Sequence, residues 1–217
     1  MRQKTPRWPR FNNAANRYID CFTDFMILFR KPSEARIRGF LLSQSDQAFS
    51  YAEVGMTRGN APSGYNADHN RIELGHGAQT FARAVEAMRD WKMFALRWVK
   101  LYYSDAPIEP GTTVCVRVQH LGFWSLNACR IVYVIDEDGP VKRFGLAYGT
   151  LTDHAERGEE RFTLEWNPED DSVSYDILAF SRPGLLFAKL GYPFTRALQK
   201  RFARDSKQAM LRAVTVD

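Results

Sequence analysis

The sequence lacks the long apolar run that would identify a membrane-spanning or secreted chain. The longest candidate, from Tyr18 to Phe29, contains Asp20 and Asp24 and is far shorter than the ~20 residues that a bilayer-spanning helix needs. Basic residues before it resemble the start of a signal peptide, but its uninterrupted apolar part, FMILF, is too short for the hydrophobic region of one. We therefore predict no cleaved leader and no transmembrane segment.

Disulfide chemistry is also poorly supported, because the chain has only three cysteines. Cys21, Cys115 and Cys129 form no CxxC pair, and an odd number of cysteines without a recognisable leader is typical of reduced thiols. Cys115 and Cys129 fall within strand-like segments, where we expect buried and inert side chains. The sequence therefore predicts a cytoplasmic protein.

No motif for a known type of catalysis occurs in the chain. A GxSxG nucleophile motif is absent, and no histidine stands in a recognisable local frame with a cysteine. The segment Gly75, His76, Gly77 resembles a small anion-binding turn, but the Lys and Ser/Thr of a phosphate-binding loop are absent. No zinc or di-iron spacing is present. We predict no metal and no cofactor, and the sequence leaves open whether the protein is an enzyme.

The charge of the chain is positive and unevenly distributed. The 30 Lys and Arg residues exceed the 25 Asp and Glu residues, which gives a formal net charge of +5 at pH 7. The excess lies in residues 1–64, and the predicted last helix, from Pro193 to Val214, is also basic. Aromatic residues are not interleaved with these basic residues on one strand face, as a nucleic-acid stacking platform requires. The sequence therefore argues against nucleic acid as a partner.

The 217 residues are enough for one sizeable core. We expect a basic arm at residues 1–31 and a single domain at residues 32–214. Within this domain, residues 32–64 form a helix and loop that lead into a core at residues 65–214. The stretch from Ser50 to Asn70 is rich in Gly, Pro and Asn, which predicts a loop up to the first strand of the core.

The core has the predicted order strand, helix, six strands and long helix. The six strands are expected at 96–103, 112–121, 123–136, 142–151, 160–166 and 171–181. Turn-forming connections predict antiparallel neighbours, and a curved sheet of this kind needs an apolar helix against its concave face. The predicted fold class is α+β, with a helix-grip-like curved antiparallel sheet of about seven strands wrapped around a long C-terminal helix.

The segment DHAERG, which begins at Asp153, concentrates polar residues between two predicted strands. Asp153 and Gly158 favour a tight turn, so a structural hairpin is the first interpretation. In a second, His154 or Glu159 lies at the mouth of a cavity and orients a polar group of a ligand. A metal site formed by His154 with Glu156 or Glu159 is a third, but its spacing matches no known signature.

Large and small side chains alternate along the predicted strand at 142–151. Phe144, Leu146 and Tyr148 share one face, and the glycines of the other face bend the sheet or admit a close approach. With a helix across the sheet, this pattern predicts an apolar cavity with a few polar contacts. The candidate ligand-binding residues are Trp124, Asn127, Arg130, Tyr148, His154, Glu159 and Tyr175. A slip of one residue in the inward face of a strand would exchange this set.

Five segments of the chain resemble one protein family. They are Phe49–Gly59 (FSYAEVGMTRG), Gly64–Phe94, Trp124–Val134 (WSLNACRIVYV), Phe144–Phe162 and Tyr175–Ser206. They look like the bacterial and plant family called domain of unknown function 1990 (DUF1990), also catalogued as UPF0548. The order of elements is similar to the helix-grip (SRPBCC-like) fold of START, Bet v 1 and polyketide-cyclase-like proteins. This resemblance implies a cavity between the sheet and the last helix, and it implies no particular reaction.

Three functional interpretations remain. The first is a small-molecule-binding protein that holds an apolar or aromatic ligand in the cavity. The second is a cyclase-like or hydrolase-like enzyme of the same fold. The third is a basic adaptor that binds nucleic acid or an anionic membrane through the arm and the last helix. The ligand, any turnover and the oligomeric state do not follow from the sequence.

Overall fold

The computed structural model describes residues 27–102, 107–184 and 192–215. The predicted basic arm therefore lies outside the described residues, apart from residues 27–31. The helices are α1 (Glu34–Gln44), α2 (Ala78–Arg89) and α4 (Tyr192–Val214), with short 3₁₀ turns η1 (Met56–Arg58) and η2 (Lys92–Phe94). The strands are β1 (Ile27–Leu28), β2 (Asn66–His76), β3 (Val99–Tyr102), β4 (Thr113–His120), β5 (Phe123–Asp138), β6 (Lys142–Thr150), β7 (Glu156–Trp166) and β8 (Ser172–Pro183).

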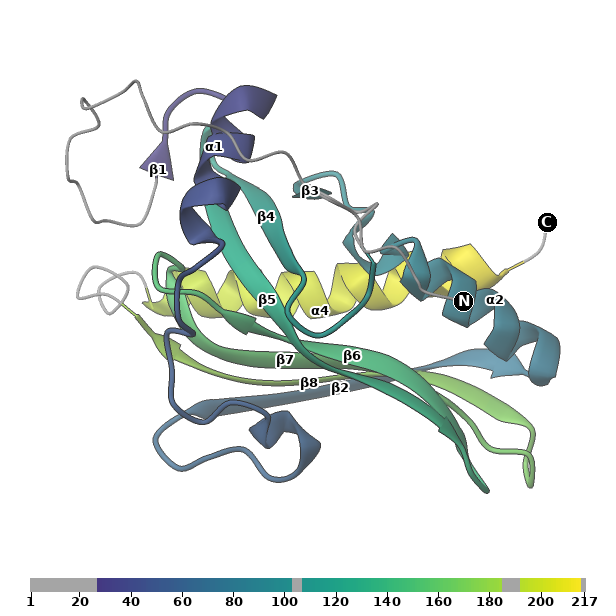
Figure 1. The fold of residues 1–217 in the computed structure, drawn as a ribbon. Coiled ribbons are helices and arrows are strands. Elements are labelled where there is room, and N and C mark those ends of the chain that lie inside the picture. The colour runs from purple at the N-terminus through teal and green to yellow at the C-terminus, as the bar shows by residue number, and fades with distance from the viewer. Residues whose placement is uncertain (1–26, 103–106, 185–191, 216–217) are drawn as a thin grey trace, which may run out of the picture.

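The strands form one antiparallel sheet with the order β2-β8-β7-β6-β5-β4-β3. From β3 to β8 each strand pairs with the next one along the chain, as expected for a meander. The long strand β2 pairs with β8, and the two-residue β1 pairs with β5 off this path. The predicted α+β fold, a curved antiparallel sheet of about seven strands with a long C-terminal helix, is confirmed (Figure 1).

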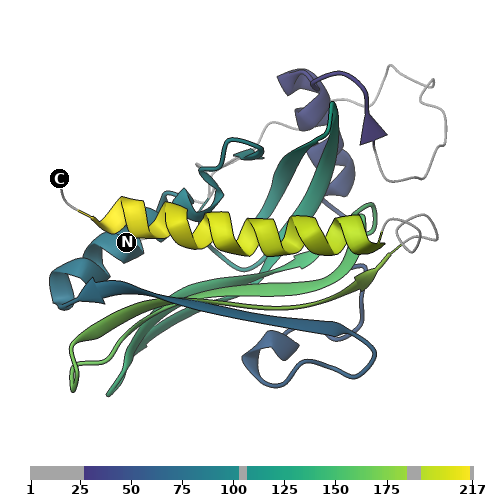
Figure 2. The same cartoon turned by 180° about the vertical axis from the view of Figure 1, so that it is seen from behind.

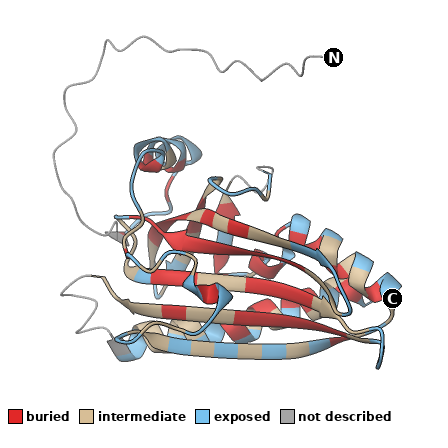
Figure 3. Ribbon diagram, turned by 60° about the horizontal axis from the view of Figure 1, so that its bottom comes forward, coloured by how far each residue is buried: buried red, intermediate tan, exposed pale blue. Residues whose placement is uncertain are grey.

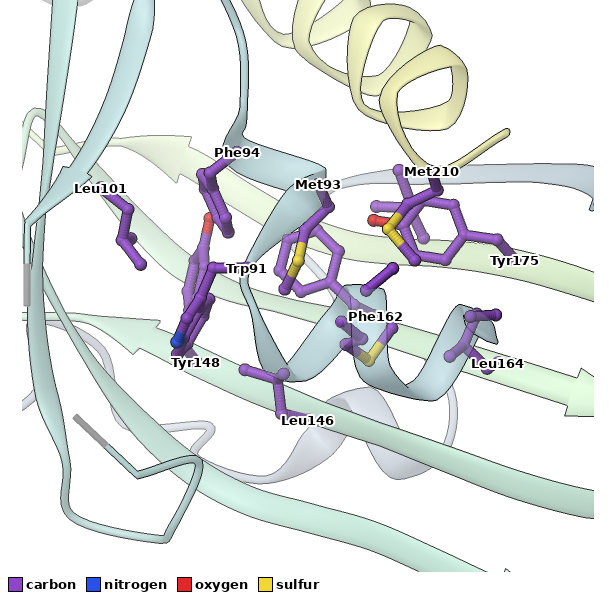
Figure 4. Packing of buried hydrophobic residues seen from close by; sticks show 14 of the residues in the cluster. Trp91, Met93, Phe94, Leu101, Leu146, Tyr148, Phe162, Leu164, Tyr175 and Met210 are labelled. Carbon is purple, nitrogen blue, oxygen red and sulfur yellow. The ribbon is translucent and has the colours of Figure 1, made fainter. Parts of the chain in front are cut away.

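Helix α4 lies across the concave face of the sheet, and α2 packs beside its C-terminal part (Figure 2). The main core lies between these helices and the strands, where Met88, Phe162 and Met210 have no exposed surface. Figure 4 shows Phe94 and Tyr148 close together in this core, with Phe162 beside them. Because α4 presents apolar residues to the sheet and charged residues to solvent, its amphipathic pattern determines how it packs.

The opposite, convex face of the sheet carries a second and smaller core beneath α1. Its buried residues are Leu28, Ile37, Phe40, Cys115, Leu126, Ala128 and Leu151. The loop between α1 and β2, which contains η1, runs along the same face further from α1 (Figures 1 and 2). Both faces of the central strands are therefore covered, which explains the long buried runs in β5 and β6.

Strand β2 begins earlier than the sequence predicted. Residues Asn66–Asn70 were expected in a loop, but they pair with β8. Asp68 faces α4 and binds Arg196, whereas His69, on the other face, binds Asp176. Half-buried and exposed positions alternate along most of this edge strand (Figure 3). Polar partners on both faces remove the apolar alternation by which a strand is recognised in a sequence.

Candidate functional site

A cavity of about 710 Å³ lies between the concave face of the sheet and the first half of α4. Its volume falls within the ~300–1,000 Å³ of small-molecule sites. Apolar walls are formed by Phe94, Trp98, Val99, Val116, Val118, Leu198 and Phe202. Across from β3 and β4, the lining includes Asp68, Asn70, His154, Glu156, Glu160 and Ser181. The cavity therefore has an apolar side and a side that we call the acidic side, defined by Asp68, Glu156 and Glu160.

Glu156 and Glu160 are the two carboxyl groups that β7 contributes to the acidic side. Because side chains alternate along a strand, both share the concave face with Phe162. The Tyr148 hydroxyl, on β6, donates a hydrogen bond to Oε2 of Glu160 at 2.7 Å. Nε2 of Gln199, on α4, lies 2.7 Å from each carboxylate oxygen of Glu156. Each carboxyl group is thus held by one neutral donor.

Arg196 and Lys200 are the cationic side chains near the acidic side among the described residues. Arg196 binds the carboxylate of Asp68 through both terminal nitrogens, with one hydrogen bond of 2.7 Å. Among the residues that the structure describes, no Lys or Arg forms a salt bridge with Glu156 or Glu160. Lys200 also lines the cavity, but it is exposed to solvent. Glu156 and Glu160 therefore have no salt-bridge partner among the described residues.

Burial raises the pKa of both carboxyl groups to about 7. For Glu160, desolvation outweighs the hydrogen bond from Tyr148, which lowers the pKa, and the charge of Glu156 raises it further. For Glu156, desolvation outweighs the hydrogen bond from Gln199 and the positive charge of Arg196. A carboxyl group with a pKa near neutrality can both give and accept a proton. The acidic side can therefore exchange protons with a bound molecule.

His154 lies in the turn before β7, where it is half-buried and lines the cavity. The first interpretation, a hairpin connection between two strands, is confirmed. Its Nδ1 accepts a hydrogen bond of 3.0 Å from the backbone N–H of Glu156. The surrounding protein atoms lower the pKa of the imidazole to about 4, so the ring is neutral at pH 7. His154 thus caps the turn and contacts the cavity, and a role in ligand binding stays a prediction.

A strip of polar side chains on β4 and β5 lies among the apolar walls. Nε2 of His120 is 2.9 Å from the hydroxyl of Ser125, which also accepts a hydrogen bond of 3.1 Å from Asn127. Burial lowers the pKa of His120, and its Nδ1 is buried without a hydrogen-bond partner among the described residues. This strip adds one unsatisfied ring nitrogen to the cavity wall.

The predicted ligand-binding residues divide between the two faces of the sheet. Asn127, Tyr148, His154 and Glu159 are among the residues around the cavity. Tyr175 is fully buried under α4, where its hydroxyl hydrogen-bonds with Ser206 at 3.0 Å.

Trp124 packs against the second core on the convex face. Arg130 donates to the backbone carbonyls of Gln44 and Ser45 at the end of α1. On β5 the cavity is lined by Phe123, Ser125, Asn127 and Cys129, so the structure does not bring Trp124 and Arg130 to it.

The carboxylate of Glu159 lies on the convex face, opposite that of Glu160. Oε2 accepts hydrogen bonds of 2.7 Å from the Tyr51 hydroxyl and the Gly55 N–H. Oε1 accepts from the N–H of Thr57 at 3.0 Å and from its hydroxyl. Gly55 has a φ of 87°, a conformation that glycine adopts without strain. These bonds fix the η1 loop to the sheet, so the carboxylate of Glu159 has a structural role.

Within the described ranges, no three His, Cys, Asp or Glu side chains come together in a way that could hold a metal ion. None of the described helices combines the length and the apolar content needed to cross a membrane. Cys115 and Cys129 are unpaired and buried, and burial raises the pKa of the Cys115 thiol to about 12. These thiols are protonated at neutral pH, as inert thiols are.

The sequence prediction left Glu160, Gln199 and Asp68 out of the binding residues. A signal for Glu160 was available, because it shares its strand face with Phe162 and Leu164. Gln199 and Asp68 gave no such signal, since their position depends on how α4 crosses β2 and β8. No local sequence pattern specifies that crossing, because it depends on how the whole fold packs.

Known proteins resemble this chain in sequence and in structure. The chain is 39% identical over 208 residues to a UPF0548 protein of Dictyostelium discoideum, a match that covers 87% of this chain and 96% of the relative. It is 36% identical over 200 residues to a UPF0548 protein of Deinococcus radiodurans, covering 87% and 98%. The crystal structure of Ara h 8.0201 is similar with a TM-score of 0.47 and 15% identity, covering 70% of this chain and 98% of that one. The family model described as domain of unknown function 1990 matches residues 50–209. The chain therefore belongs to the DUF1990 family.

Proposed function

We propose that the protein binds a small molecule with an apolar body in the cavity beneath α4. The cavity is the observation that carries this proposal. Its volume of about 710 Å³, its mostly apolar walls and its few polar groups on one side are the properties of a small-molecule site.

The size of the cavity argues against a packing defect. Protein interiors are close-packed, and an unfilled apolar space costs stability in proportion to its volume. Large side chains such as Phe94, Trp98 and Phe202 line this space and do not fill it. A bound molecule would restore the missing contacts.

A cavity-filling substitution tests the proposal. Ala179 lies on β8 opposite Glu160 and lines the cavity, and its neighbour Leu178 points to the other face. The uncharged dye N-phenyl-1-naphthylamine should bind the wild-type protein with increased fluorescence. Ala179→Phe should weaken dye binding by about tenfold or more, because an added ring overpacks the site by ~1–3 kcal/mol. Leu178→Phe is the matched control and should bind the dye normally. Equal dye binding by a folded Ala179→Phe variant would contradict the proposal.

The two carboxyl groups favour acid–base catalysis in the same cavity as a second candidate function. Glu160, with a pKa of about 7 and a hydrogen bond from Tyr148, has the properties of a general acid or base. Incubation with a small-molecule extract of the organism that makes the protein, followed by mass spectrometry, tests this function. A compound consumed by the wild-type protein and spared by Glu160→Gln supports it, and equal consumption by both opposes it.

A further inference from the structure

The acidic side of the cavity indicates the chemical class of the ligand, an inference that rests on the proposed function. Three acidic side chains, Asp68, Glu156 and Glu160, line one region, and the guanidinium of Arg196 is bound to Asp68. We infer that the cavity selects an apolar molecule that carries a protonated amino group, and that Glu160 binds this ammonium group directly.

Glu160 is the carboxyl group with the most unused hydrogen-bonding capacity. Its Oε2 accepts one hydrogen bond, from Tyr148, and its Oε1 accepts none from any residue that the structure describes. A carboxylate has about four acceptor positions. The side chain is half-buried and lies on the cavity lining, so a ligand can reach it. An ammonium group supplies up to three donors and the opposite charge.

Glu156 contributes at longer range. Residues four apart on a strand have Cα atoms ~13 Å apart, so one ammonium group bound at Glu160 does not also contact Glu156. Both oxygens of Glu156 already face Nε2 of Gln199. Its negative charge still favours a cation within the same partly desolvated cavity. We therefore expect a smaller effect from Glu156 than from Glu160.

A cation fits this side of the cavity better than a neutral or an anionic group does. An anion would meet two carboxyl groups with no salt-bridge partner among the described residues. A neutral group would not compensate a desolvated carboxylate, so Glu160 would have to keep its proton. A protonated amine compensates the charge and uses the free acceptor positions of Glu160. The apolar walls around Trp98 and Val116 then hold the rest of the molecule.

The affinity for an amine should depend on pH. The titratable or charged groups around the two glutamates are Asp68, Cys129, Tyr148, His154, Tyr175, Arg196 and Lys200. Among these, His154 stays neutral above pH 6 because its pKa is about 4. Glu160 is mostly protonated at pH 6 and mostly ionised at pH 8, because its pKa is about 7. An aliphatic ammonium group, with a pKa of ~10.4 as in lysine, stays charged throughout. Binding near pH 7 should therefore release protons from the protein.

Three probes with the same apolar body test the inference: 1-adamantylamine, 1-adamantanol and 1-adamantanecarboxylate. Each is titrated against the wild-type protein by displacement of N-phenyl-1-naphthylamine and by calorimetry in buffers of different ionisation enthalpy. The amine should bind about tenfold or more tightly than the alcohol, because a charged hydrogen bond replaces a neutral one. The carboxylate should bind more weakly than the alcohol. Amine binding should strengthen from pH 6 to pH 8 and release protons, whereas alcohol binding should be flat.

Two variants assign the effect to Glu160. Glu160→Gln should remove most of the preference for the amine over the alcohol, measured as the ratio of their two dissociation constants. Glu169→Gln, which removes an equal charge from an exposed turn, should keep the preference. If the alcohol binds as tightly as the amine, the inference is wrong while the proposed function stands. If neither the dye nor any probe binds, the proposed function itself fails. A preference for the amine that survives in Glu160→Gln would overturn the role of Glu160.

Discussion

Glu159 and Glu160 are adjacent on β7 and lie on opposite faces of the sheet. Their carboxylates differ in how many hydrogen bonds they accept. Glu159 is 2% exposed, and its carboxylate accepts hydrogen bonds from three residues of the loop that contains η1. Glu160 accepts one, from Tyr148, and its pKa is raised to about 7. A buried carboxylate with several donors stabilises the fold, whereas one with few donors can still bind something else. Glu159 therefore anchors the loop that contains η1, and Glu160 is the candidate binding group.

The same contrast extends to the two faces around these residues. On the convex face, Arg161 donates to the carbonyl of Thr57 at 2.8 Å and to Asp176 at 3.2 Å, so its charge is compensated. On the concave face, the ion pair of Asp68 and Arg196 leaves the nearby glutamates with neutral partners. The charges around Glu159 on the convex face are therefore compensated, whereas Glu156 and Glu160 on the concave face have only neutral hydrogen-bond partners among the described residues.

The largest effect should come from truncating the two glutamates separately. Glu159→Ala leaves the Tyr51 hydroxyl and the N–H groups of Gly55 and Thr57 without their acceptor in a buried place. We expect a loss of about 3–5 kcal/mol in the free energy of unfolding, because each buried donor left without an acceptor costs about 1–3 kcal/mol. Glu160→Ala should cost less than about 1.5 kcal/mol, because it removes one hydrogen bond beside a cavity.

Urea denaturation measures both values, and limited proteolysis should cut the loop around η1 faster in Glu159→Ala only. Equal losses of stability in the two variants would remove the distinction between anchor and site.

A second substitution, on β6, tests the hydrogen bond between Tyr51 and Glu159. A Cβ on Gly149 would lie 2.1 Å from the hydroxyl oxygen of Tyr51, which is not compatible with the observed packing. Gly149→Ala should therefore displace Tyr51 from Glu159 and destabilise the protein by about 1–3 kcal/mol. Gly139→Ala is the control, since its Cβ would have 3.8 Å to the nearest atom and should change stability little. A thermal melt of the two variants gives the comparison, and identical melting temperatures would contradict it.

The order of elements was predictable because each strand from β3 to β8 is rich in apolar and β-branched residues and ends in turn residues. The large side chains Phe144, Leu146 and Tyr148 do share the concave face, as the alternation predicted. The glycines opposite them serve a purpose that the sequence left open. Gly149 lies on the convex face and makes room for Tyr51, a residue about a hundred positions earlier in the chain.

The sequence did not determine which face of β5 lines the cavity. The five residues of β5 from Ser125 to Cys129 are buried on both faces, because one face meets the main core and the other the second core. Alternation then carries no information about which face is which. The predicted residues Trp124 and Arg130 lie on the convex face, and the cavity is lined by their neighbours Ser125 and Cys129. Knowledge of where α1 packs would have resolved this choice.

A smaller effect concerns the pH dependence of stability on the concave face. The pKa of Glu160 is about 7 in the folded protein and ~4.5 in an unfolded chain, so the folded protein binds the proton more tightly. This contribution to stability is full below pH ~4.5 and is lost as the pH rises through 7. Glu160→Gln does not titrate. Its stability relative to the wild type should therefore improve by about 1 kcal/mol between pH 5 and pH 8, a value reduced for partial exposure. Urea titrations at both pH values measure this change, and a constant difference would show that Glu160 is ionised throughout.

The smallest effect at neutral pH should come from His154, which lies beside the acidic side and carries no charge there. In His154→Asn the side-chain oxygen can replace Nδ1 as acceptor for the N–H of Glu156, so stability at pH 7.5 should change by less than about 0.5 kcal/mol. The pH dependence has the opposite sign to that of Glu160. The folded pKa of His154 is about 4, below its ordinary 6.5, so the unfolded chain binds the proton more readily. The wild type therefore loses stability as the pH falls from 6.5 towards 4, and His154→Asn does not. In a chemical denaturation series, the free energy of unfolding of the variant relative to that of the wild type should be higher at pH 5 than at pH 7.5. If it instead loses stability at pH 5, the imidazole is charged in the folded protein and forms an ion pair with the acidic side of the cavity.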